Sequence, residues 1–234
     1  MVEVLQCRLP PPSLADNTGD WDRLVRGLKE KGYSPIQIHP SRINHVVTRI
    51  RQGRYRVTAV LGYYFCHWEL IEVFPGFEEH PALGFAIDLG TSRLLFYLLD
   101  LRRGDLLAER SVPNPQVPHG EDILTRILFA RRSNNLRLLR RLLRDIFNET
   151  MHGMVQDLGG HASDVYALAI AGNTTMSHLL LGLDPSALCK EPYLPAMNRF
   201  PVFLKYTVLN SLAVRTVAVF NSPAENISVS FALE

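Results

Sequence analysis

The sequence predicts a soluble α/β protein in two parts, a small α+β domain over residues 1–80 and a β-β-β-α-α-β-α half-domain over residues 83–198. Strand-like apolar runs and helix-periodic segments alternate between glycine and proline breaks. The acidic stretch 77–81, which ends in proline, separates two different successions of elements. Hydrophobic residues are 47% and charged residues 21% of the chain, a balance typical of a globular protein with a packed core.

The first part contains two helices and four strand candidates. Residues 2–9 are predicted as a strand, since the prolines at 10–12 prevent its continuation. From Asp20 the apolar residues recur at helical spacing, and Gly32 ends this helix after basic residues. A second helix is predicted over residues 41–52. The other strand candidates are residues 36–38, 55–61 and 68–74.

Three apolar runs open the second part, at residues 83–89, 94–101 and 106–112. Because the turns between them are short, we expect consecutive antiparallel hairpins. Helices at 121–130 and 134–156, a strand at 165–171 and a helix at 174–181 complete the order. The stretch 157–160, with its paired glycines, is interpreted as the exit loop of the long helix.

Residues 199–234 form a tail with strand-like apolar residues but no assigned element. Between Phe200 and Phe231 its charged residues are Lys205, Arg215 and Glu225. We expect this apolar tail to dock weakly on the face of the half-domain that its own helices leave open.

The net charge and the first twelve residues argue against several classes of protein. The formal net charge of +2 gives no reason to expect a nucleic-acid partner. The stretch 1–12 carries an acidic residue and three prolines where a signal peptide needs a basic start and an apolar run. We therefore expect a cytoplasmic protein without a membrane anchor.

The isolated cysteines argue against a metal centre. Iron–sulfur clusters and structural zinc sites need ligands at short, repeated spacings, which Cys7, Cys66 and Cys189 do not have. We interpret all three as buried, inert thiols of a reducing compartment.

A candidate phosphate site begins where the first run of the half-domain ends. Asp88 lies near the end of that run, and Gly90, Thr91 and Ser92 form the turn that follows. Such a turn can direct backbone N–H groups and small hydroxyls at a phosphate, while the carboxylate holds a hydrated Mg²⁺. An ordinary hairpin with an aspartate beside its turn would show the same pattern.

A second polar segment opens the last predicted helix. Asn173, Thr174 and Thr175 can cap this helix, or they can bind a ligand at the positive end of its dipole. His178 is interpreted as a core histidine, because no other histidine has a paired helical spacing with it. The arginines of the two preceding helices are interpreted as a solvated face: Arg126, Arg131, Arg132, Arg137, Arg140, Arg141 and Arg144.

Several stretches of the sequence resemble the reductive activators of corrinoid proteins. FAIDLGTSRLLFYLLDLRRGDLLAERSVPNPQ (85–116) and HGEDILTRI (119–127) are similar to the start of the ATPase domain of that family. AGNTTMSHLLLGLDP (171–185) and PYLP (192–195) are similar to a later part of it. LPPPSL (9–14), with Asp16 and the helix around residues 22–24, resembles the small middle domain that precedes this ATPase.

The resemblance implies a fold and a function. The fold is the ribonuclease-H-like half-domain of the acetate and sugar kinases, heat-shock chaperones and actin (ASKHA). The function is ATP-dependent activation of a corrinoid protein of a methyltransferase system, in which a [2Fe–2S] ferredoxin domain or another electron donor protein returns Co(II) to Co(I) in one-carbon metabolism. Residues implied to bind ATP are Asp88, Gly90, Thr91, Ser92, Gly172, Asn173 and Thr174, with Asp88 at the Mg²⁺.

The sequence also departs from the family pattern. Arg93 stands where the family often has threonine, and its guanidinium could contact a phosphate or block it. Neither a ferredoxin-type cysteine segment nor a second phosphate hairpin occurs, so we expect a truncated chain that is inactive alone and binds ATP weakly. Two alternatives stay open: a non-catalytic module that binds a corrinoid protein, and a small-molecule kinase of the same superfamily.

We predict that the purified chain, after anaerobic reconstitution with iron and sulfide, shows no iron–sulfur absorbance. The physical reason is the isolation of its three cysteines. Analysis of iron and acid-labile sulfide checks this, and stoichiometric amounts of both would contradict it.

Overall fold

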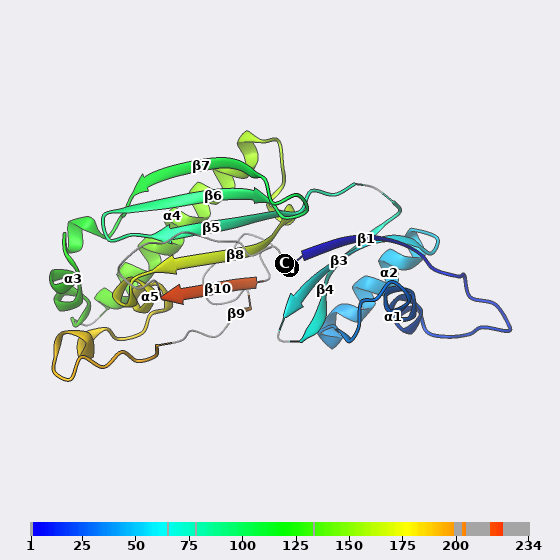
Figure 1. Ribbon diagram of the computed structural model, residues 1–234, viewed down its shortest axis with the longest axis horizontal. Coiled ribbons are helices and arrows are strands. Elements are labelled where there is room, and N and C mark those ends of the chain that lie inside the picture. Colours follow the sequence, from blue (N-terminus) through cyan, green and yellow to red (C-terminus); the bar gives the residue numbers. More distant parts are fainter. Residues whose placement is uncertain are drawn as a thin grey trace. The chain divides into compact units, whose positions relative to one another are not determined.

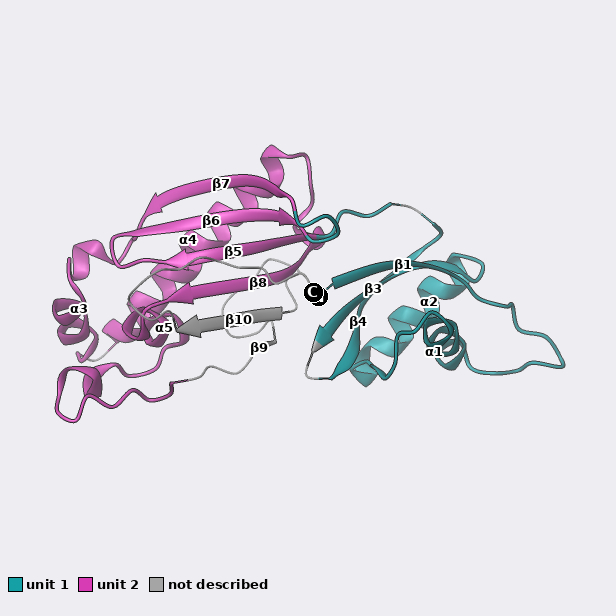
Figure 2. Ribbon diagram, viewed as in Figure 1, with its two compact units in different colours: residues 1–82, 101–104 teal, residues 83–100, 105–234 magenta. Residues whose placement is uncertain are grey.

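A computed structural model describes residues 2–64, 66–77, 79–132, 134–198, 203–204 and 216–221, the last two segments as backbone only. The chain divides into two compact units, residues 1–82 with 101–104 and residues 83–100 with 105–234 (Figure 2). The predicted α/β class and the order of strands and helices are confirmed.

The first unit is a four-stranded sheet with two helices. Its strand order is β1-β3-β4-β2, with bounds β1 (Val2–Arg8), β3 (Arg56–Tyr64), β4 (His67–Pro75) and β2 (Ile36–Gln37). The helices are α1 (Asp20–Glu30) and α2 (Ile43–Gln52), and a 3₁₀ turn, Pro40–Arg42, leads into α2. Leu24 and Leu28 of α1 and Ile50 of α2 are fully buried against the strands, so this unit has its own core.

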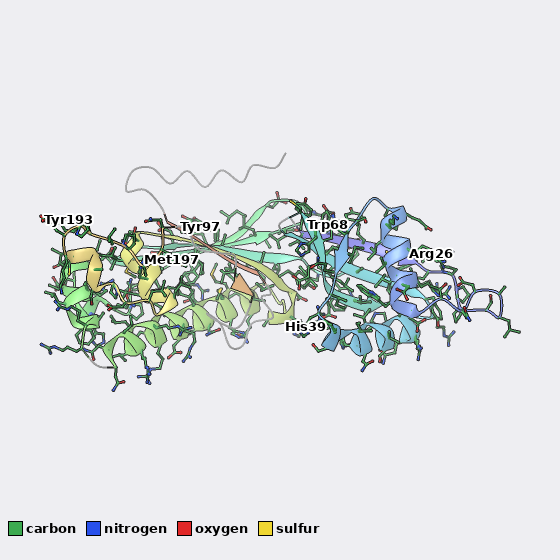
Figure 3. The ribbon with its side chains drawn as sticks, turned by 90° about the horizontal axis from the view of Figure 1, so that it is seen from below. Arg26, His39, Trp68, Tyr97, Tyr193 and Met197 are labelled. Carbon is green, nitrogen blue, oxygen red and sulfur yellow. The ribbon has the colours of Figure 1, made fainter. Side chains whose placement is uncertain are left out.

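A buried arginine shapes the loop between β1 and α1. Arg23 is inaccessible to solvent; its Nη1 donates to the Pro10 carbonyl at 3.0 Å and to Asp16 Oδ2 at 2.8 Å. Its Nη2 donates to the carbonyls of Asp16 and Thr18 at 3.1 and 3.0 Å. Arg26, labelled in Figure 3, adds an ion pair with Asp16 at 3.1 Å. Hydrogen bonds from Thr18 and from both arginines hold the pKa of Asp16 far below its usual range.

The second unit is built on a six-stranded sheet of order β7-β6-β5-β8-β10-β9 (Figure 1). β5 (Leu83–Leu89), β6 (Arg93–Asp100) and β7 (Leu106–Pro113) form the predicted antiparallel meander. β8 (Val165–Gly172) pairs parallel with β5, and β10 (Thr216–Asn221) pairs parallel with β8. β9 (Phe203–Leu204) pairs antiparallel with β10.

The described helices of this unit are α3 (Ile123–Ala130), α4 (Asn135–Asp157) and α5 (Thr174–Leu181). The 3₁₀ turns Val117–His119, Ala162–Asp164 and Ser186–Cys189 connect its elements. Helix α4 presents an apolar stripe to the sheet, in which Phe147 meets Phe96 edge to face with ring centroids 5.4 Å apart. The helix ends at Asp157 and Gly159 adopts φ +70°, which confirms the predicted exit loop.

The described residues of the stretch 199–234, for which the sequence assigned no element, form two strands. These are β9 and β10, which extend the sheet beyond β8. The predicted docking of the rest of this tail lies outside the described residues.

The cysteine interpretation needs one correction. Cys7 is buried and Cys189 half-buried, but Cys66 is exposed in the connection between β3 and β4, with φ +71°. Cys66 lies outside the two strands and is accessible to solvent, so the expectation of burial is wrong for this residue. In the part of the chain that the structure describes, no helix is both long and apolar enough to cross a membrane.

We expect Phe147→Ala to lower the free energy of unfolding by about 3–5 kcal/mol, because the fully buried ring leaves a cavity against Phe96. Urea denaturation measures the loss. Leu128→Ala is the matched control, since that side chain is 54% exposed and its removal should cost less than about 0.5 kcal/mol. Equal losses in the two variants would contradict this account of the core.

Candidate functional site

The two polar segments predicted from the sequence meet at one edge of the second sheet. β5 and β8 are parallel, with Asp88 opposite Ala171 and Leu89 opposite Gly172. Their carboxyl ends therefore lie side by side, and the turn after β5 adjoins the start of α5 after β8 (Figure 1). Asn173 joins the segments directly, because its Nδ2 donates to Thr91 Oγ1 at 3.2 Å.

The turn between β5 and β6 is held from the end of β7. Asn114, which is 2% exposed, donates from Nδ2 to the Gly90 carbonyl at 2.8 Å, and its backbone N–H donates to the Ser92 carbonyl at 2.9 Å. A Cβ on residue 90 would lie 2.3 Å from the carbonyl oxygen of Arg93, so only glycine fits there. Thr91 is half-buried and Ser92 exposed, which leaves both hydroxyls near the edge of the sheet.

Asp88 is a half-buried carboxylate on the face of β5 opposite the main core. Its neighbours Ile87 and Leu89 point into that core, and strand side chains alternate between faces. Burial raises the pKa of the Asp88 carboxyl. Among the described residues, no hydrogen bond or ion pair is found for this carboxylate. A cation at this position would offset the cost of desolvation.

These residues fit a magnesium nucleotide in their chemistry. Mg²⁺ prefers oxygen ligands and commonly takes only one or two carboxylates, with water and phosphate oxygens for the rest. Within the described ranges no group of three or more histidine, cysteine or acidic side chains could hold a metal ion alone. Asp88 would therefore hold the ion together with the phosphates of the ligand.

Asn173 takes the capping role that the sequence left open. Its Oδ1 accepts a hydrogen bond from the Met176 N–H at 2.9 Å, which confirms the helix-cap interpretation. A Cβ on Gly172 would lie 3.0 Å from the Leu89 Cβ, so glycine permits the close approach of β5 and β8. Thr174 is half-buried at the first position of α5, and ligand binding by these residues stays a prediction.

The guanidinium of Arg93 forms hydrogen bonds with the neighbouring strand β7. Its Nε donates to Ser111 Oγ at 2.9 Å and its Nη2 to the Ser111 carbonyl at 3.4 Å. These bonds hold the guanidinium on β7, so Arg93 needs no phosphate partner to be satisfied.

His178 is a core residue, as the sequence predicted. It is inaccessible to solvent; its Nδ1 lies 2.7 Å from the Thr174 carbonyl, and its Nε2 accepts from the Ala196 N–H at 3.0 Å. The ring is therefore neutral, with its proton on Nδ1. Burial lowers its pKa, and the hydrogen bond that the ring donates to the Thr174 carbonyl opposes that shift.

The sequence interpretation missed Arg126. The expectation of a solvated face is wrong for this residue, which is 0% exposed. Its Nη1 donates to the Thr91 carbonyl at 3.0 Å, and its Nη2 and Nε donate to the Gly120 carbonyl at 2.6 and 3.1 Å. A helical signal was present, since Arg126 occupies the same stripe of α3 as Ile123, Ile127 and Ala130.

Two family models match the chain. Residues 83–225 match the RACo middle region and residues 1–80 match the RACo linker region, RACo being the reductive activator of corrinoid proteins. The chain belongs to the family of reductive activators of corrinoid proteins. The resemblance stated from the sequence is thereby confirmed.

Known activators extend well beyond the matched regions. The corrinoid activation enzyme RamQ of Eubacterium limosum is 32% identical over 127 residues, which are 53% of this chain and 21% of RamQ. A solved reductive activator for corrinoid, iron-sulfur protein has the same fold, with a TM-score of 0.85 and 24% identity over 94% of this chain. This chain spans 36% of that structure.

We predict that His178 makes this activator chain less stable in mild acid. Because burial lowers the folded-state pKa below the ordinary 6.5, the unfolded chain binds the proton more readily. The stability that comes from keeping His178 neutral is fully present above about pH 6.5, and it is lost as the pH falls toward the pKa of the folded state. Urea denaturation from about pH 7.5 to about pH 5, which is from about one unit above the ordinary pKa to about one and a half units below it, measures the effect.

His178→Gln should flatten this part of the pH profile. The matched control is His67→Gln, at a half-exposed position of β4 in the first unit, which should keep the wild-type profile. A profile that is the same in the wild type and in His178→Gln would refute the assignment.

Proposed function

We propose that this chain forms the linker region and the first nucleotide-binding part of an activator that uses Mg²⁺–ATP to reactivate a corrinoid protein. The reaction returns Co(II) to Co(I), so that the corrinoid can again accept a methyl group. One observation carries the proposal: the carboxylate of Asp88, which has no partner among the described residues, shares one edge of the sheet with the Gly90–Ser92 turn and the N-terminus of α5.

The proposed roles follow from the donors at that edge. Gly90, Thr91 and Ser92 offer backbone N–H groups and two hydroxyls to a phosphate. Thr174 opens α5, whose N-terminal N–H groups and dipole favour negative charge, and Gly172 and Asn173 precede it. Asp88 would hold Mg²⁺ against the phosphates. Bound Mg²⁺–ATP supplies the free energy of hydrolysis that the activator couples to the reduction.

The electron would come from a separate centre. The family resemblance points to a [2Fe–2S] ferredoxin domain or another electron donor protein, and Cys7, Cys66 and Cys189 lack the spacing for such a cluster. A corrinoid protein of a methyltransferase system is the proposed partner, in cytoplasmic one-carbon metabolism. Membership of the activator family disfavours the kinase alternative.

A non-catalytic corrinoid-binding module is the second candidate. It is favoured by the hydrogen bond from Asn173 to Thr91, because this bond engages polar groups of the two segments with each other. This module would bind a corrinoid protein and show no nucleotide binding. Analytical ultracentrifugation with a purified corrinoid protein, in the presence and absence of Mg²⁺–ATP, separates the two candidates.

We expect the chain to bind Mg²⁺–ATP weakly and Asp88→Ala to reduce the affinity at least about tenfold, or ~1.4 kcal/mol, the size of one interaction with a charged group. Calorimetry measures both constants. Asp105→Ala, which removes an exposed carboxylate from the β6–β7 turn, is the matched control and should change nothing. Tight binding that is unaltered in Asp88→Ala would reject the assigned residue and the weakness together.

A further inference from the structure

Arg126 carries a buried positive charge next to the candidate phosphate turn. Its partners are neutral: besides the carbonyls of Thr91 and Gly120, its Nη1 lies 3.5 Å from Gln116 Oε1 and 3.2 Å from Met176 Sδ. Within the described part of the chain, no carboxylate lies at ion-pair distance from this guanidinium. The acidic group that acts on it is Asp122, an exposed residue that caps α3.

An uncompensated buried guanidinium is expensive to maintain. Hydrogen bonds to carbonyl groups offset only part of the hydration free energy that the guanidinium loses on burial. Burial accordingly lowers the pKa of Arg126. An apolar side chain of similar length would fill the same stripe of α3 without this cost. The charge therefore contributes something that packing alone does not.

The geometry shows what the guanidinium holds together. It connects the β5–β6 turn through Thr91, the loop before α3 through Gly120, and α5 through Met176. Gly120 has φ +150°, and a Cβ there would lie 2.6 Å from the backbone nitrogen of Arg126, so glycine lets this loop pass close to the first turn of α3. Gln116, itself fully buried, extends the contacts to α4 by donating to the Leu139 carbonyl at 3.0 Å.

We infer that Arg126 is a positioning residue: it fixes the Gly90–Ser92 turn through the Thr91 carbonyl and provides the buried countercharge for an anionic phosphate bound there. The identity of the anion rests on the proposed function, whereas the fixing of the turn does not. A phosphate would complete the charge balance that the described residues leave open around this guanidinium.

The test compares variants that separate charge from geometry. Arg126→Lys keeps the charge but cannot reach the Thr91 and Gly120 carbonyls at once, and Arg126→Met removes both functions. Arg137→Met is the matched control, on the exposed side of α4. Hydrogen exchange of the peptide covering residues 88–93 reports on the turn, and thermal shifts with Mg²⁺–pyrophosphate report on the anion.

We expect the turn peptide to exchange at least about tenfold faster in both Arg126 variants, with exchange in the first unit unchanged. The thermal shift by Mg²⁺–pyrophosphate should disappear in Arg126→Met and persist, reduced, in Arg126→Lys. If Arg126→Met does not fold, Arg126→Lys alone still gives the turn measurement.

The inference would be overturned if the turn peptide exchanged at the wild-type rate in both Arg126 variants. Faster exchange spread evenly over the whole second unit would also overturn it. If the turn responds selectively but wild-type protein binds neither pyrophosphate nor ATP, the fixing of the turn is supported, while the countercharge role and the proposed function both fail.

Discussion

The parallel pairing of β5 with β8 is the constraint on which the candidate site depends. It brings Thr91 and Asn173, 82 residues apart in sequence, within one hydrogen bond of each other. The pairing is held from one face by the core, where Ile87 and Ile170 pack with the stripe of α4. The other face of β5 carries Asp88. The same strand thus buries apolar side chains on one side and presents a carboxylate on the other.

Two kinds of hydrogen bond hold the turn: amide groups bind its two ends, and the guanidinium of Arg126 binds the Thr91 carbonyl between them. Asn114 binds the turn at both ends, through the Gly90 and Ser92 carbonyls. Asn114 Oδ1 also accepts from the Gln116 N–H at 2.9 Å, so the two buried amides form one network. Among the described residues, the carboxylate of Asp88 and the guanidinium of Arg126 form no ion pair with each other.

Local patterns predicted most of the fold, whereas contacts distant in sequence escaped prediction. The meander followed from short turns, and the cap of α5 from the asparagine before it. Strands β9 and β10 were not assigned, because the partner of β10 is β8, more than forty residues earlier. The burial of Arg126 was missed because this residue was grouped with the exposed arginines of α3 and α4. Its position in the apolar stripe of α3 predicts burial. Asp88 and the turn after it were recognised from their residue types and from their place after the first strand of the half-domain.

Asn173 determines whether the hydroxyl of Thr91 donates or accepts their shared hydrogen bond. The Oδ1 atom of Asn173 accepts from Met176, so its Nδ2 is the group that donates to Thr91 Oγ1. With its oxygen used as an acceptor, Thr91 keeps its own hydroxyl hydrogen available as a donor. Such a donor suits an anionic oxygen. One amide therefore sets both the cap of α5 and the hydrogen-bonding role of Thr91 in the turn, while the carboxylate at this edge of the sheet is that of Asp88.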